Sequence, residues 1–187
     1  MVDQFLRTLR RTPERLLHPR RREDAIRRLR AARDARRFLV VCHGNICRSP
    51  FAAAVLRRAL AHTDAEVFSG GLFGPGRQPP REALVAARRR GVELRDHRSR
   101  LLTPEKVAAA DLIFVMDLAQ QLAVHAQFRR EARDIILLGD LDPLAITTRA
   151  VRDPVDQPVP VFDEVYARIE RCVRVAAVTW ESAAYPR

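Results

Sequence analysis

Cysteine, long apolar runs and lysine are all scarce in this chain of 187 residues. Three cysteines form an odd number, which argues against a disulfide framework and favours a reducing compartment. No apolar run approaches the length of about 20 residues that crosses a bilayer, and the N-terminal region lacks the continuous apolar segment of a secretory signal. We therefore expect a cytoplasmic protein without a transmembrane segment.

Lysine occurs only at Lys106, and arginine carries nearly all of the positive charge. The net charge is +11, of which residues 1–37 supply eight charges, because they hold 13 arginines against 5 acidic residues. Such a segment is typical either of a solvated tail or of a contact with an acidic partner, a nucleic acid or an anionic membrane. No DNA-binding motif distinguishes between these possibilities.

The basic segment also has a helical pattern. His18-Pro19 is expected to interrupt it, and a helix is expected over residues 20–37. Ile26 and Leu29 form an apolar stripe that is too thin for a core helix. We therefore expect a basic helical extension over residues 1–37 that lies loosely on a globular domain, residues 38–187.

Strands and helices alternate through that domain, whose length and 47% apolar content suffice for a core. This alternation predicts a parallel sheet with helices on both faces, and ligands bind such sheets beyond the carboxyl ends of the strands. The expected strands are 38–42, 66–68, 111–116 and 135–138, and the main expected helices are 48–62, 79–91, 118–128 and 162–184. Residues 139–160 are expected to form a long loop rich in proline.

The stretch from Phe38 to Pro50, F-L-V-V-C-H-G-N-I-C-R-S-P, places a tight polar loop between a buried strand and a helix. Backbone N–H groups at a helix N-terminus suit a tetrahedral oxyanion such as phosphate. Gly44 and Asn45 tolerate the left-handed backbone that such a loop needs. Arg48 can grip two phosphate oxygens, and Cys42 in the same nest would be held as a thiolate nucleophile.

Other interpretations of these residues remain open at this point. Cys42 could be a buried structural cysteine, and Cys42, His43 and Cys47 could be metal ligands, although a single cysteine pair makes a poor zinc site. Arg48 could be one of many surface arginines. Asn45 and Ser49 could be ordinary capping residues.

The segment V-C-H-G-N-I-C-R-S-P resembles the signature loop of the low-molecular-weight protein tyrosine phosphatases, and the resemblance extends from Phe38 to near the C-terminus. It implies a single doubly wound three-layer α/β domain with a four-stranded parallel sheet in the order 2-1-3-4. It also implies hydrolysis of protein phosphotyrosine without a cofactor or a metal. Under this resemblance Cys42 and Arg48 are catalytic, and the phosphate-binding loop comprises His43, Gly44, Asn45, Ile46, Cys47 and Ser49.

The family places its general acid in an Asp-Pro pair ahead of the last helix, and this chain has two such pairs in that loop. Asp153-Pro154 matches the family pattern, so the resemblance assigns the general acid to Asp153, whereas Asp142-Pro143 is expected to form only a turn. Asp96-His97 resembles a family pair that supports the loop asparagine. By this resemblance His97 braces Asn45; an exposed histidine without a function is the alternative.

The implied mechanism is attack of the Cys42 thiolate on phosphorus, with Asp153 first as acid and then as base for hydrolysis of a cysteinyl-phosphate. The resemblance also implies a reversible, protective disulfide between Cys42 and Cys47, and hence redox sensitivity. Cys172 lies in the expected closing helix, where core packing is its expected role.

The chain departs from the family pattern after Asp153-Pro154, where Val155-Asp156-Gln157 replaces an aromatic residue that lines the substrate pocket. Phe73 could supply one wall instead. A related activity is arginine-phosphate hydrolysis, whose enzymes tend to have threonine where this chain has Ile46. Arsenate reduction needs further cysteines between Arg48 and Arg171, which this chain lacks, and the intact catalytic set argues against a phosphate-binding module without activity.

Overall fold

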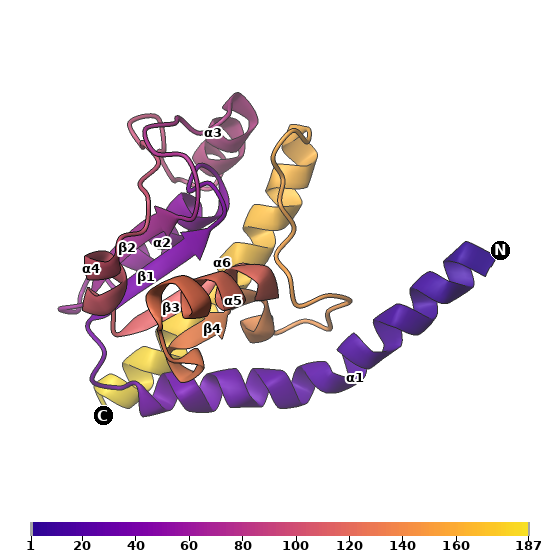
Figure 1. The fold of residues 1–187 in the computed structure, drawn as a ribbon, viewed down its shortest axis with the longest axis horizontal. Helices are drawn as coiled ribbons and strands as arrows, with labels where there is room; N and C mark the ends of the chain where they lie inside the picture. The colour runs from indigo at the N-terminus through magenta and orange to yellow at the C-terminus, as the bar shows by residue number, and fades with distance from the viewer. Residues whose placement is uncertain (1, 187) are drawn as a thin grey trace.

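A computed structural model describes the backbone of residues 2–186 and the side chains of residues 14–186. Helices and strands alternate along the chain, with two short 3-10 turns, η1 (Ala132–Asp134) and η2 (Leu138–Leu141), before and after the last strand (Figure 1). The strands are β1 (Arg37–Cys42), β2 (Glu66–Gly71), β3 (Leu112–Val115) and β4 (Ile135–Leu137). The helices are α1 (Val2–Ala31), α2 (Arg48–Ala59), α3 (Arg81–Arg88), α4 (Pro104–Ala109), α5 (Leu118–Phe128) and α6 (Val159–Ala184).

The four strands form one parallel sheet in the order β2-β1-β3-β4, which confirms the predicted topology. Cys42 at the end of β1 is in register with Gly71 at the end of β2, and Val41 with Val115 at the end of β3. The carboxyl ends of the strands therefore meet at one edge, where the loop after Cys42 begins.

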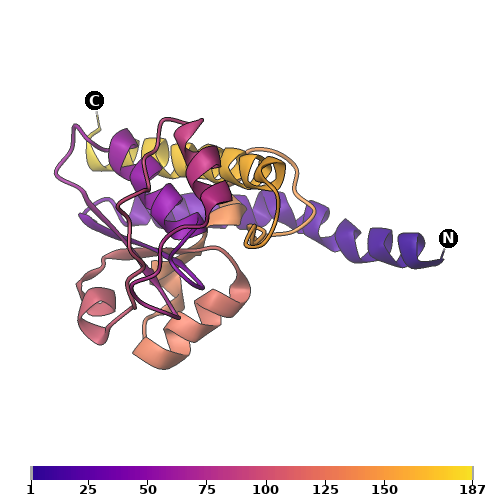
Figure 2. The same ribbon diagram turned by 90° about the horizontal axis from the view of Figure 1, so that it is seen from above.

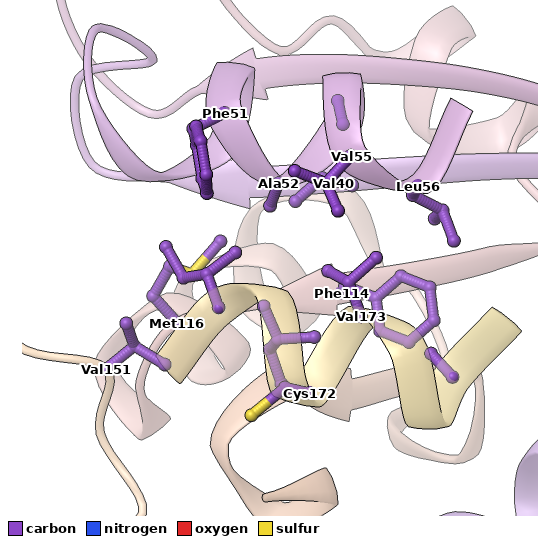
Figure 3. Packing of buried hydrophobic residues seen from close by; sticks show 14 of the residues in the cluster. Val40, Phe51, Ala52, Val55, Leu56, Phe114, Met116, Val151, Cys172 and Val173 are labelled. Atoms are coloured by element: carbon purple, nitrogen blue, oxygen red, sulfur yellow. The ribbon is translucent and has the colours of Figure 1, made fainter. Parts of the chain in front are cut away.

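Successive residues along each strand face opposite layers of helices. On one face, Val40 and Phe114 pack with α2, α3 and α6, and Figure 3 shows their side chains between α2 and α6. On the other face, Leu39 and Ile113 pack against α4 and α5. Cys172 on α6 is fully buried in the first cluster, in agreement with its expected packing role.

The helix α1 runs unbroken through His18-Pro19, so the expected interruption there was wrong. Figure 1 shows it passing beside the domain and turning away toward the N-terminus, and Figure 2 shows it alongside α6. The N–H group that Pro19 lacks leaves the carbonyl of Arg15 without a helical donor, and Arg15 is exposed, so water can serve that carbonyl.

The last turns of α1 belong to the core, which corrects the expectation of a loosely attached tail. Leu29 is fully buried and Ala25 nearly so. The two residues are four positions apart, so they lie on the same face of α1, and α1 packs against α6. Trp180 on α6 donates its indole N–H to the carbonyl of Ala32 at 3.2 Å. Arg28 donates to the carbonyls of Arg133 and Ile135 beside β4. The division of the chain at residue 37 remains a prediction.

The largest difference from the expected strand boundaries lies in β2, since the ends of the other strands differ by at most one residue. β2 continues to Gly71 instead of ending at Phe68, because Gly70 and Gly71 stay paired with β1. A Cβ atom at Gly71 would lie 3.0 Å from Asn45, so this glycine permits a close approach of the loop and does not mark a turn. None of the helices within residues 2–186 combines the length and the apolarity that crossing a membrane requires.

Candidate active site

The loop from Cys42 to Arg48 joins β1 to α2 at the carboxyl edge of the sheet. Cys42 is the last residue of β1 and Arg48 the first of α2, as the sequence predicted. Asn45 has a φ of 49°, in the left-handed region that asparagine tolerates. The absence of a Cβ at Gly44 leaves room for the Arg77 guanidinium, which donates to the Gly44 carbonyl at 3.2 Å.

Cys42 lies buried at the floor of this loop with two hydrogen-bond partners at its sulfur. The Ser49 Oγ is 3.0 Å from the Cys42 Sγ, and the Asn45 backbone N–H donates to the same sulfur at 3.2 Å. Asn45 Nδ2 donates to Ser49 Oγ at 2.8 Å, so the hydroxyl proton is free to point at the sulfur. Donors aimed at a cysteine sulfur favour its anionic, nucleophilic form.

Asn45 also ties the loop to its surroundings through its side chain and its carbonyl. Its Nδ2 donates to Ser69 Oγ at 2.9 Å, and its Oδ1 accepts from the Arg100 N–H at 2.9 Å. His97 donates from Nε2 to the Asn45 carbonyl at 2.7 Å. His97 therefore contacts the residue that it was expected to brace, and burial of this half-buried ring lowers its pKa.

Arg48 is almost fully buried and spans the site. One terminal nitrogen donates to the carbonyl of Val151 at 3.1 Å, and the other is paired with the Asp153 carboxylate. The Arg48 Nε is buried and has no partner within the described part of the chain. A buried guanidinium N–H without a partner can bind an oxyanion, in line with the phosphate-binding role expected of Arg48.

The two Asp-Pro pairs of the long loop have different surroundings. The Asp153 side chain is 45% exposed and contacts Arg48, so it lies at the mouth of the loop. Asp142 is buried away from the site and forms ion pairs with Arg168 and Arg171 at 3.0 and 3.2 Å. Asp142 also accepts from the Leu144 N–H in a turn, as predicted, but its burial and its ion pairs were not expected.

The sequence reasoning missed Asp117 and Ser69. Asp117 lies two residues after the end of β3 and caps α5 by accepting from the Gln120 N–H at 2.8 Å. It has a carboxylate oxygen 3.8 Å from Arg48. Its place just after a buried strand was a usable signal, since parallel strands end at the same edge. The hydrogen bond of Ser69 to Asn45 joins two distant segments, which no local pattern indicates.

The mouth of the site opens into a cavity of about 620 Å³. Its walls come from the loops after β1 and β2, from α5 and from the segment before Asp153, and they include His43, Phe73, Gln127 and Arg152. The His43 and Phe73 rings are stacked with centroids 5.8 Å apart, and the Arg77 guanidinium lies 5.3 Å from the Phe73 centroid. These contacts hold an exposed aromatic surface beside the loop.

The other cysteines have surroundings unlike those of Cys42. Cys47 is buried beneath the loop, where Tyr166 donates to its carbonyl at 3.3 Å, and burial raises the pKa of its thiol. Burial also raises the pKa of Cys172 to about 12. All three thiols are free, and the Cys42–Cys47 disulfide remains a prediction.

In the part of the chain that is described, no three histidine, cysteine or acidic side chains are grouped as metal ligands would be.

Comparison with known proteins identifies the family. A family model described as low molecular weight phosphotyrosine protein phosphatase matches residues 37–181. The chain belongs to this family. Its members are cysteine-dependent phosphatases, and the match covers the loop, both Asp-Pro pairs and most of α6. A probable low molecular weight protein-tyrosine-phosphatase, EpsP, from Ralstonia nicotianae is 34% identical over 137 residues, which are 73% of this chain and 90% of the relative.

Solved structures support the same assignment. The tyrosine phosphatase Wzb from Escherichia coli K30, in complex with sulphate, matches this low-molecular-weight phosphatase with a TM-score of 0.70 and 26% identity, over 77% of this chain and 97% of Wzb. The YwlE arginine phosphatase from Geobacillus stearothermophilus matches with a TM-score of 0.68 and 25% identity, over 81% and 97% of the two chains. The same fold therefore carries two substrate classes.

Proposed function

We propose that this phosphatase hydrolyses phosphotyrosine on proteins through a cysteinyl-phosphate intermediate. The observation that carries the proposal is the position of Arg48, which is buried beside the Cys42 loop and bridges it to Asp153. A nucleophile, an oxyanion clamp and an acid thus lie around one small bowl of backbone N–H groups. Cysteine-based phosphoryl transfer requires this combination of groups.

In the first step the Cys42 sulfur attacks phosphorus in line, and an S–P bond forms as the bond to the tyrosyl oxygen breaks. The loop N–H groups and Arg48 hold the equatorial oxygens, on which negative charge is concentrated. The Ser49 hydroxyl and the Asn45 N–H stabilise the sulfur anion before attack and again when sulfur leaves.

Asp153 supplies the proton for the departing tyrosyl oxygen. It belongs to the exposed rim of the site, so it can meet a leaving group that projects toward solvent. In the second step the Asp153 carboxylate removes a proton from water, the water oxygen attacks phosphorus, and the S–P bond breaks. Inorganic phosphate is then released, and the Cys42 thiolate and the protonated Asp153 are regenerated for the next turnover.

Phosphotyrosine is favoured by the aromatic wall of His43 and Phe73, because a phenyl ring can stack on it. Ile46, partly buried in the loop, is also consistent with this class. The second candidate is phosphoarginine. It is favoured by Asp117, whose carboxylate lines the cavity and could hold a guanidinium, and by the non-aromatic Val155 after Asp153-Pro154.

Matched peptides that carry phosphotyrosine or phosphoarginine at the same position distinguish the two classes. We expect the higher kcat/KM on the phosphotyrosyl peptide, and we expect Phe73→Ala to reduce that value while it leaves hydrolysis of the phosphoarginyl peptide nearly unchanged. Preference for phosphoarginine would transfer the proposal to the second class. Loss of all turnover in Cys42→Ser serves as the control for contaminating phosphatases.

An acidic partner for the arginines of the N-terminal extension and a cytoplasmic location both remain predictions. The described residues include exposed arginines on α1, among them Arg20, Arg27 and Arg30, which would serve such a contact. Binding that weakens steeply with added salt would be its signature.

A further inference from the structure

The helix α1 reaches the loop that carries Asp153 through a buried histidine. His18 is only 5% exposed and donates from Nε2 to the carbonyl of Asp142 at 2.9 Å, across 124 positions of the sequence. His18 also lines a cavity of about 530 Å³ between α1 and residues 143–145. The contact therefore crosses between the extension and the loop, and His18 lies outside the 37–181 segment that defines the family match.

Asp142 joins this contact to α6. Its carbonyl accepts from α1, while its side chain, 2% exposed, accepts from Arg168 Nε at 3.0 Å and from Arg171 at 3.2 Å. A buried carboxylate held by two guanidinium groups has little freedom to move, because any displacement leaves charges unpaired in the interior. The side chain of Asp142 is thus held by α6, whereas its backbone carbonyl is held by His18 of α1.

Arg168 carries the connection to the segment before Asp153. While its Nε contacts Asp142, its two terminal nitrogens donate to the carbonyls of Thr148 and Ala150, each at 2.8 Å. The next residue, Val151, donates its backbone N–H to the carbonyl of Met116 at 2.8 Å and accepts from Arg48 at its own carbonyl. The backbone just ahead of Asp153 is therefore held on one side by a side chain that is itself fixed at Asp142.

Asp153 itself has little else to position it. Its side chain is 45% exposed and contacts Arg48, and its other hydrogen bond comes from the Val155 N–H of its own loop at 3.3 Å. A substrate phosphate that binds Arg48 competes with the first of these contacts. The backbone that precedes Asp153 must then set the distance of the acid from the leaving oxygen.

We propose that α1 positions Asp153 for proton donation, with His18 as the positioning residue and Asp142 and Arg168 as its connection to the loop. The inference rests on the proposed role of Asp153 as the general acid. The helix stays docked without His18, because Ala25 and Leu29 are buried and Trp180 binds the carbonyl of Ala32. A change at His18 therefore tests the connection and leaves the rest of the helix in place.

The test uses kcat/KM for phenyl phosphate and 4-nitrophenyl phosphate in the full-length chain. Phenolate is the poorer leaving group and needs protonation more, so a misplaced acid affects it more. In His18→Leu, which keeps an apolar side chain of similar volume but no donor, we expect kcat/KM to fall roughly tenfold for phenyl phosphate, since small misplacements are costly. The value for 4-nitrophenyl phosphate should change much less.

His18→Gln, which retains an N–H donor, should restore the ratio of the two kcat/KM values toward that of the wild type. His125→Leu is the matched control, because His125, on the exposed side of α5, also has its Nδ1 2.7 Å from a backbone carbonyl, that of Arg130. Should His18→Leu fail to fold, as judged by circular dichroism and thermal unfolding, the smaller His18→Ala replaces it.

The variant Asp153→Asn distinguishes an error in the general-acid role of Asp153 from an error in the positioning role of α1. If it changes the ratio while folded His18→Leu keeps the ratio of the wild type, the positioning role of α1 is wrong and the general acid stands. If Asp153→Asn also leaves the ratio unchanged, the assignment of the acid is wrong and the inference about α1 is overturned with it.

Discussion

Arg48 and Asp153, which lie 105 positions apart in the sequence, form an ion pair across the mouth of the Cys42 loop. The same guanidinium is the expected clamp for phosphate, so the carboxylate and a phosphate oxygen compete for its donors. A phosphate that binds both the partnerless Nε and this terminal nitrogen of Arg48 displaces Asp153 from the guanidinium. In the free enzyme the expected general acid, Asp153, and the expected phosphate clamp, Arg48, are therefore paired with each other.

This competition predicts an opposite effect of one substitution on binding and on turnover. Asp153→Asn removes the competing charge, so the inhibition constant of inorganic phosphate should fall roughly tenfold, which corresponds to about 1.4 kcal/mol. The same variant should lower kcat/KM for phenyl phosphate by roughly 10²- to 10⁴-fold, because the proton donor is lost. Asp156→Asn, on the exposed part of the same loop, is the control. Unchanged or weaker phosphate inhibition in Asp153→Asn would count against the competition.

A second prediction concerns Asn45. Asn45→Ala removes the bonds to Ser49, Ser69 and the Arg100 N–H and places an alanine at a φ of 49°. We expect a loss of about 2–4 kcal/mol in the free energy of unfolding, because buried donors lose their partners and the left-handed backbone is strained. Asn45→Gly loses the same bonds without that strain and should be the more stable variant by about 1 kcal/mol. Urea denaturation measures both values, and equal stability of the two variants would show that backbone strain is not part of the cost.

The contrast between local and distant contacts explains how far the sequence could predict this site. Cys42, Asn45, Arg48 and Ser49 lie within one strand–loop–helix stretch, so their arrangement follows from local geometry. The partners of that loop come from Ser69, His97, Asp117 and Asp153, and periodicity carries no information on which distant segments meet. Asp153 and His97 were found through the family resemblance, whereas Asp117 and Ser69 were missed.

The same limit applies to the fold. Alternating strands and helices predicted the parallel sheet, since each element buries one face against the next layer. The burial of Leu29 depends on where α6 passes, and the connection from His18 to Asp142 spans 124 positions, so neither could be read from a thin apolar stripe. The expected strand 66–68 stopped short of Gly70 and Gly71, because glycine composition alone does not distinguish a turn from a close approach of two backbones.

A third prediction concerns pH. Burial lowers the pKa of His97 in the folded protein below its ordinary value of about 6.5. The unfolded chain then binds more protons between the two pKa values, so the stabilising contribution is complete above about pH 6.5 and is lost as the pH falls below that value. His97→Gln keeps a donor for the Asn45 carbonyl but does not titrate. Urea midpoints measured at about pH 7.5 and about pH 5.5 should therefore differ less in His97→Gln than in the wild type. An equal difference in the two proteins would refute a lowered pKa of His97 in the folded state.

A fourth prediction concerns thiol reactivity. Burial raises the pKa of Cys172 to about 12 and also raises the pKa of Cys47, so both remain neutral thiols near pH 8. Iodoacetamide should therefore modify Cys42 first, and inorganic phosphate should slow that modification by occupying the loop. Peptide mapping by mass spectrometry reads out all three sites. Modification of Cys172 ahead of Cys42 in folded protein would contradict this assignment of the reactive thiol.

The most direct measurement of the central claim is the trapping of the intermediate. The enzyme is mixed with a radiolabelled phosphotyrosyl peptide, denatured within the first turnover and digested for peptide mapping. Phosphate should be attached to Cys42 in the wild-type enzyme, and that cysteinyl label should be absent from Cys42→Ser. Turnover without any phosphorylated enzyme, or label on a residue other than Cys42, would contradict a mechanism through cysteinyl-phosphate.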